Sequence, residues 1–153
     1  MDSNIYKILT DINCSIVKFR SIYANWAKEK GINYHELLVL YTLRDNPLCT
    51  QKEICESYFL PKQTINNIVA DLKKKGYINL KSDERNKRLK LFELTSEGKI
   101  YADRYMKELT YCEEKSIKMF GEKRLKQITD MLNEYCGILN MNLYEKEVSH
   151  NEE

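Results

Sequence analysis

Cationic and amide side chains gather in the middle of this 153-residue sequence, in two groups that suit different chemistry. The stretch 81–88 reads Lys-Ser-Asp-Glu-Arg-Asn-Lys-Arg, and its lysines and arginines suit contacts with phosphate oxygens. Gln63, Asn66 and Asn67 recur at a spacing that places them on one face of a helix. Such amides can form hydrogen bonds with base edges, including bidentate contacts to adenine. The two groups together have the chemistry that a reader of duplex DNA requires.

The charge distribution supports this interpretation. Residues 60–94 carry 9 basic and 4 acidic side chains, a net charge of +5. Residues 1–59 carry 7 of each and are neutral, whereas residues 95–153 carry 9 basic and 12 acidic side chains, net −3. A basic middle between neutral and acidic flanks indicates one face for a polyanion. A merely solvated charged surface would explain the charge alone equally well.

Composition excludes several other classes of protein. With 42% hydrophobic and 31% charged residues the chain is typical of one soluble globular domain, and only 5 Gly and 2 Pro favour long helices. No apolar run is long enough to span a membrane, and the N-terminus lacks the features of a signal peptide. We therefore expect a cytoplasmic protein without a membrane partner.

Motifs for catalysis or metal binding are missing from the sequence. The five cysteines show no C-x-x-C spacing and the two histidines lie far from any cluster, so we expect reduced thiols, no metal site and no cofactor. A glycine-rich phosphate loop, a Ser/His/Asp order and an HExxH motif are likewise missing. The sequence therefore does not predict an enzyme.

Hydrophobic periodicity predicts four helices before residue 76. Apolar residues recur at helical spacing over 5–26, and Gly31 suits the end of that helix. Asn33 suits the start of a second helix, which ends before Pro47. Thr50 and Glu53 form a capping box for a short helix with Ile54 and Cys55 inward, and Pro61 suits the first position of a fourth helix.

The second half of the chain predicts a hairpin followed by two long helices. Residues 77–81 and 89–94 alternate as strands, and Thr95 or Ser96 can cap a helix whose apolar stripe includes Ile100 and Tyr101. Gly121 separates it from a last helix. The fold class is therefore mainly α with a small β-hairpin wing: a winged helix (33–94) with a helix-turn-helix at about 50–74, a wing at about 77–94, and flanking helices at 1–30 and 96–145.

The flanking helices carry apolar stripes that need a partner surface. We expect them to pack against a second copy of the chain as dimerisation helices, while residues 146–153 form a polar tail. The other interpretation is that these helices cover the core of their own domain, which spans residues 1–145.

In this order and spacing the motifs resemble those of the multiple-antibiotic-resistance regulator (MarR) family of bacterial winged-helix repressors. The resemblance covers nearly the whole chain, and its most specific element is the wing signature D-x-R-x-x-R at Asp83, Arg85 and Arg88. Its other elements are Leu37, Leu40 and Leu43, Thr50, the stretch 64–72 running into 75–78, and an L-T-x-x-G motif at 94–98. One departure is Lys81, where the family often has arginine; the charge is kept and the planar fork is lost.

The resemblance implies a homodimeric, sequence-specific regulator of transcription that is expected to be a repressor. The helix from Pro61 would enter the major groove at a palindromic promoter site, and the wing would reach an adjacent minor groove. Asp83 would orient Arg85 or Arg88. The expected DNA-contacting residues are Thr50, Lys52, Lys62, Gln63, Thr64, Asn66, Asn67, Lys81, Arg85, Lys87 and Arg88, with Lys90 as a further phosphate contact and Thr50 serving equally well as a helix cap.

Family members often release DNA when a small ligand or an oxidant acts on them. Six aromatic residues are candidates to line a site for a small aromatic effector, although aromatic residues at helical spacing are also typical of a core: Tyr6, Tyr23, Trp26, Tyr34, Tyr41 and Tyr101. Cys14 is the candidate redox-sensitive thiol, against the alternative of an inert, half-buried cysteine. The competing function is a protein-interaction module that keeps the winged-helix fold. The sequence does not identify the operator, the regulated genes or the effector.

Overall fold

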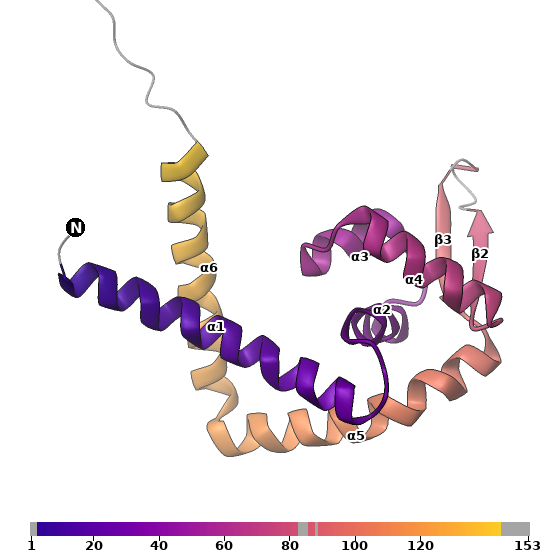
Figure 1. Cartoon of the computed structure of the whole chain (residues 1–153), viewed down its shortest axis with the longest axis horizontal. Helices are drawn as coiled ribbons and strands as arrows, with labels where there is room; N and C mark the ends of the chain where they lie inside the picture. Colours follow the sequence, from indigo (N-terminus) through magenta and orange to yellow (C-terminus); the bar gives the residue numbers. More distant parts are fainter. Residues whose placement is uncertain (1–2, 83–85, 88, 145–153) are drawn as a thin grey trace, which may run out of the picture. The chain divides into compact units, whose positions relative to one another are not determined.

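A computed structural model describes residues 3–82, 86–87 and 89–144. It is mainly helical with one small antiparallel sheet, which confirms the predicted fold class (Figure 1). The chain divides into two compact units, Met1–Lys107 and Glu108–Glu153. The elements in order are α1 (Ser3–Glu29), α2 (Tyr34–Asp45), β1 (Cys49–Thr50), α3 (Gln51–Tyr58), α4 (Lys62–Lys74), β2 (Ile78–Ser82), β3 (Lys90–Leu94), α5 (Ser96–Phe120) and α6 (Glu122–Tyr144).

The helix ends in the first unit follow the predicted caps. Asn33 Oδ1 accepts hydrogen bonds from the backbone N–H of His35 (2.9 Å) and of Glu36 (3.3 Å) and so begins α2. Gly76 has φ +76° after α4, in the left-handed conformation that glycine adopts without steric cost. Pro61 lies immediately before α4 and is not its first residue, because the helix begins at Lys62.

The turn between α3 and α4 has an unusual residue in the left-handed conformation. Phe59 has φ 51° and ψ 41°, and the N–H of the next residue, Leu60, bonds to Cys55 O at 3.0 Å. Glycine normally occupies this position of a helix-ending turn. Phe59 is 95% exposed, so packing of its side chain within the chain does not offset the cost of this backbone conformation.

A third strand joins the predicted hairpin. The sheet order is β1-β3-β2, with Thr50 of β1 opposite Leu91 and Ile78 of β2 opposite Leu94. The sequence did not predict this strand, because its two residues are too few to show a period of two. The pairing of β1 ties the start of α3 to the wing, which consists of β2, β3 and the loop between them.

The core of the first unit lies around α2, which contacts α1, α3, α4 and β3 (Figure 1). Its largest fully buried aliphatic side chains come from α2, α3 and α4: Leu37, Leu40, Leu43, Ile54, Ile65 and Leu72. Full burial of each such side chain stabilises the fold by about 1.5–3 kcal/mol. Helix α2 therefore supports the helix-turn-helix by packing against the buried faces of α3 and α4.

The wing, the end of α4 and the start of α5 meet at four residues, Gly76, Tyr77, Thr95 and Gly98, which we call the Thr95 junction. Thr95 Oγ1 donates to Gly76 O (2.8 Å) and accepts from the N–H of Gly98 (2.9 Å). The N–H of Thr95 donates to Tyr77 O at 3.0 Å. A Cβ placed on Gly98 would lie 2.0 Å from Tyr77 O, so only glycine fits there.

The buried face of α5 differs from the predicted one. Ile100 was expected in the apolar stripe but is 65% exposed, whereas Ala102 and Met106 are buried. Tyr101 is half-buried, as a residue at the edge of the stripe would be. Gly98 and Ala102 lie four positions apart on the same face of α5. Because both are small, this face can approach the rest of the first unit closely, so the size of these side chains and not their hydrophobicity determines which face is buried.

The second unit contains the remainder of α5 and all of α6, which meet at Gly121 with φ +101°. None of the residues of α6 is buried in the single chain, although the helix carries many apolar side chains. Among the described residues, no helix combines the length and the apolar character that a membrane crossing would require.

Replacing Gly98 by alanine should destabilise the protein, since the new methyl group must displace the Tyr77 carbonyl. We expect a loss of about 2–3 kcal/mol in the free energy of unfolding, near the upper end for overpacking. The matched control is Gly137→Ala in α6, where nothing lies within 4 Å of the added Cβ. That variant should gain about 0.5–1 kcal/mol, because alanine favours a helix interior.

Urea titrations followed by circular dichroism measure both variants. Equal stability of Gly98→Ala and wild type would contradict the close packing at the Thr95 junction.

Candidate nucleic-acid interface

Helix α4 separates its apolar and polar side chains cleanly. Ile65, Val69 and Leu72 are buried against the rest of the first unit. The opposite face is polar and, after Lys62, carries no charge until the last two turns; its exposed residues are Lys62, Gln63, Asn66, Asn67 and Ala70. Thr64 in the first turn is half-buried. A neutral, amide-bearing face can approach base edges without a competing charge.

The amides of this face form two hydrogen-bonded pairs. Gln63 Nε2 donates to Asn67 Oδ1 at 2.9 Å, within α4. Gln51 Nε2, from α3, donates to Asn66 Oδ1 at 2.6 Å and to Lys62 O at 3.2 Å. The sequence analysis did not select Gln51, because this contact depends on how the α3–α4 turn brings the helices together. No pattern in the sequence signals it.

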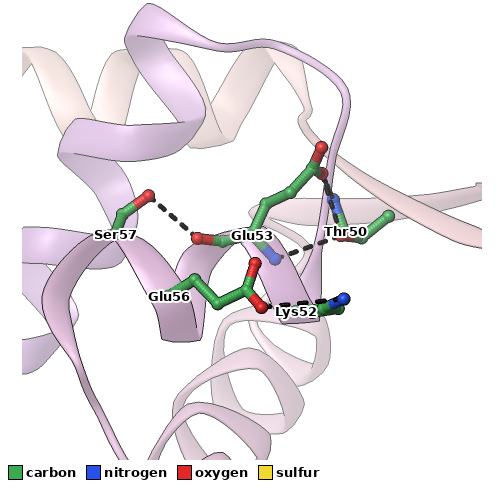
Figure 2. A network of polar contacts seen from close by, with 5 residues as sticks. All are labelled: Thr50, Lys52, Glu53, Glu56 and Ser57. Atoms are coloured by element: carbon green, nitrogen blue, oxygen red, sulfur yellow. Dashed lines mark hydrogen bonds and ion pairs between the residues drawn. The ribbon is translucent and has the colours of Figure 1, made fainter. Parts of the chain in front are cut away.

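Helix α3 begins with the predicted capping box, which Figure 2 shows. Glu53 Oε2 accepts from the backbone N–H of Thr50 (2.6 Å) and from its hydroxyl (2.8 Å), while the N–H of Glu53 donates to Thr50 Oγ1 at 3.2 Å. These hydrogen bonds hold the pKa of the Glu53 carboxyl below its usual value. Ile54 is fully buried and Cys55 is half-buried.

This arrangement bears on the two residues of α3 predicted to contact phosphate. The Thr50 hydroxyl already donates its one proton to Glu53, so a phosphate contact would have to replace that bond. The Lys52 ammonium lies 3.7 Å from Glu56, both side chains being well exposed (Figure 2). Such a pair is weak and leaves the lysine able to reach an anion.

The wing is described in part. Asp83, Arg85 and Arg88 lie outside the described residues, so their predicted roles remain predictions from the sequence. Lys81 forms an ion pair with Glu93 of the neighbouring strand at 2.7 Å, which offsets part of its charge.

Two further lysines of the wing are exposed: Lys87, and Lys90, which donates to Ser82 Oγ at 2.8 Å. At the end of α4, Asp71 forms an ion pair with Lys75 at 2.6 Å, so its negative charge is offset.

The residues predicted for effector or redox roles differ in their exposure and contacts. Tyr101 donates to Glu36 Oε1 at 2.9 Å and stacks on Tyr77 with ring centroids 4.4 Å apart. Burial is the main reason that the pKa of Tyr101 is raised. Tyr6 is exposed, and the remaining four aromatics are half-buried. Cys14 is exposed, not half-buried. Within the described ranges, His, Cys, Asp and Glu side chains form no cluster able to hold a metal ion.

Comparison with known proteins points to one family. Residues 30–89 match the model of the MarR family. The HTH-type transcriptional regulator SarZ of Staphylococcus aureus (strain USA300) is 25% identical over 122 residues, which are 78% of each chain.

Solved structures extend the likeness to most of the chain. NMB1585, a MarR family regulator from Neisseria meningitidis, superimposes with a TM-score of 0.81 at 28% identity, covering 90% of this chain and 96% of its own. NadR in complex with 4-hydroxyphenylacetate shares the fold, with a TM-score of 0.70 at 16% identity over 81% and 91% of the two chains.

The capping box should make stability depend on pH. The lowered pKa of Glu53 means that its contribution is complete above the ordinary value of 4.5 and is lost as the pH falls through the lower folded value. Wild type should therefore be more stable than Glu53→Gln near neutral pH, and the difference should shrink as the solution is acidified. Thermal unfolding of both proteins across this range measures the difference; a gap that stays constant with pH would contradict the role of the carboxylate.

Proposed function

We propose that this chain belongs to the MarR family of DNA-binding transcriptional regulators and is a homodimeric repressor that binds a palindromic promoter site. The observation that carries this proposal is the exposed face of α4, where three amides follow Lys62 with no charge between them. Behind that face, the buried side chains of α4 fix the helix on α2. A helix presented in this way suits the major groove, which a duplex opens to a single α-helix.

Base reading and phosphate binding fall to different parts of the proposed surface. Gln63, Asn66 and Asn67 would contact base edges, and Lys62 and Thr64 in the first turn of α4 would reach phosphate or a nearby base. Lys52 and, when released from Glu53, Thr50 would contact the backbone. In the wing, Lys81, Lys87 and Lys90 would contact phosphates, and Arg85 and Arg88, oriented by Asp83, would enter the minor groove.

Dimerisation is supported by apolar side chains left exposed at both ends of the chain. On α1 these include Ile5, Ile8, Phe19 and Ile22, and on α6 they include Ile128, Met131, Ile138 and Leu143, all at least 46% exposed. Monomeric proteins rarely expose contiguous apolar surface on this scale. A two-fold dimer would carry two α4 helices, which is why the proposed site is a palindrome.

Release of DNA by a small aromatic ligand or an oxidant is the regulatory part of the proposal. The half-buried Tyr23, Trp26, Tyr34 and Tyr41 offer apolar surface to a ring, and Cys14 is open to solvent. A mobility-shift assay with 4-hydroxyphenylacetate or hydrogen peroxide tests both routes, the second against Cys14→Ser. If the protein–DNA complex withstands both treatments, the proposal that a ligand or an oxidant releases DNA is wrong. The proposed location is the cytoplasm, where the DNA is.

The wing arginines should contribute mainly through phosphates and the negative minor groove. Replacing both Arg85 and Arg88 by alanine should weaken binding to a preferred duplex and lower the slope of log K against log salt by about 2. The matched control is Lys115→Ala with Lys118→Ala in α5, which removes the same charge from exposed positions outside the proposed surface. Fluorescence anisotropy over a series of salt concentrations gives both quantities.

Unchanged affinity and slope in the Arg85/Arg88 variant would count against DNA binding by the wing. That result would favour the alternative of a protein-interaction module that retains the winged-helix fold.

The dimer predicts a specific effect of a charge on α6. Wild type should sediment at twice the chain mass of 18.2 kDa, and Ile138→Glu should shift the protein to the monomer because a buried, unpaired carboxylate is costly. Phe59→Glu is the control, since it introduces the same residue at an apolar position that α1 and α6 do not include. A monomeric wild type, or an Ile138→Glu protein that remains dimeric, would contradict the proposed interface.

A further inference from the structure

Gln51 connects the amide face of α4 to the helix before it. Its Nε2 lies 2.6 Å from Asn66 Oδ1 and 3.2 Å from the backbone oxygen of Lys62. Gln51 is half-buried at the first position of α3, whereas Asn66 is exposed. The glutamine therefore connects a fixed point of the fold to a side chain that the proposed function places at a base edge.

The Lys62 carbonyl determines which way round the two amides lie. A backbone oxygen can only accept, so the Gln51 atom beside it must be the NH2 group, whose two hydrogens serve two acceptors. The Asn66 atom that receives the second hydrogen must then be Oδ1. As a consequence, Asn66 Nδ2 is turned away from Gln51, and both of its donors remain available to a ligand.

The second amide pair lacks such an anchor. Among the residues that the structure describes, the side chains of Gln63 and Asn67 form a hydrogen bond with each other and with no third residue, and both are exposed on the same helix. If both amides turned over together, Asn67 Nδ2 would donate to Gln63 Oε1 and the hydrogen bond would survive. The orientation of Asn66 is therefore fixed by the fold, and that of Asn67 is not.

We propose that Gln51 is a positioning residue that sets base preference by holding Asn66 with its Nδ2 donors outward, toward a purine N7 in each half-site. This inference rests on the proposed function, since it requires α4 to lie in the major groove. In that groove N7 is an acceptor on both purines, whereas cytosine presents an amino donor and thymine presents O4 beside a methyl group. An adenine adds a second contact, because Asn66 Oδ1 keeps a free lone pair that can accept from the N6 amino group.

Holding the amide in advance matters because a free side chain loses rotamer freedom when it binds. An unanchored Asn66 could present either its oxygen or its nitrogen, and would then distinguish purine from pyrimidine poorly. The anchor thus acts on discrimination between bases more than on total affinity, and this difference separates positioning from a purely structural role.

The test uses the full-length protein and a duplex obtained by selection from random sequence. Each purine of the selected half-site is replaced in turn by its 7-deaza analogue, which exchanges N7 for C–H and leaves base pairing intact. We expect wild type to lose about tenfold in affinity at one purine position, as for a hydrogen bond worth roughly 1.4 kcal/mol. Asn66→Ala should lose the penalty at that same position.

Gln51→Met keeps the length of the side chain but has no donors. It should bind the natural and the 7-deaza duplex with affinities within about twofold of each other, because Asn66 is no longer held. Gln51→Ala serves as a second variant with the same expectation if the methionine side chain disturbs folding. Gln63→Met is the matched control, which should keep the penalty of wild type at the position read by Asn66. Thermal unfolding checks that each variant is folded.

Three results would overturn the proposal in different ways. A wild type that shows no penalty at any 7-deaza position would show that Asn66 does not read N7. A full penalty in folded Gln51→Met or Gln51→Ala would show that Gln51 does not position Asn66, while leaving the proposed function intact. A wild type that selects no preferred sequence would overturn the proposed function, and this inference with it.

Discussion

The structure depends on the close approach of Gly98 to the carbonyl of Tyr77. This contact, with the Thr95 hydroxyl bonded to Gly76 O, places the end of α4, the start of the wing and the start of α5 at one point. Hydrogen bonds between backbone groups and a single hydroxyl are short and directional, so the three elements have little freedom to move separately. Within the first unit, α4 and the wing therefore keep a fixed relation to the start of α5.

Along residues 50–94, amide side chains and cationic side chains occupy different places, and the Thr95 junction holds α4 and the wing in a fixed relation. The exposed face of α4 after Lys62 carries amides, and the cations lie at its ends and on the wing. Cations attract any duplex, whereas amides distinguish one sequence from another. Two ties from α3 hold the parts together: Gln51 contacts Asn66, and Thr50 both caps α3 and pairs with Leu91 in the sheet. The first helix of the motif thus links the exposed amides of α4 to the wing.

Local signals in the sequence predicted the elements well because their causes are local. Asn33, Thr50 with Glu53, and Gly31 act within a few residues, and the structure shows each in its expected place. The missed features depend on contacts between distant segments. Strand β1 is only two residues long, and the buried face of α5 was assigned to Ile100 because the effect of a small residue at Gly98 appears only against Tyr77. The Gln51–Asn66 contact likewise depends on the turn between α3 and α4. Phe59 has a left-handed backbone conformation in that turn, which a phenylalanine in the sequence does not predict. For the candidate site, the sequence predicted which side chains of α4 and which lysines of the wing lie on the surface, but not that Lys81 is paired with Glu93.

We propose that this surface recognises a particular DNA sequence as a symmetric pair. The most direct test of this proposal is to select bound fragments from the source genome with the purified protein at moderate salt, and to sequence and footprint them. For a symmetric dimer we expect an enriched inverted repeat. The centres of its half-sites should lie about one helical turn of DNA apart, or a whole number of turns. That repeat should be bound roughly 1,000-fold or more tightly than unrelated duplex at the same salt concentration. Bound fragments that share no motif would contradict sequence-specific binding by a symmetric dimer. Equal affinity for the selected fragments and for unrelated duplex would contradict it as well.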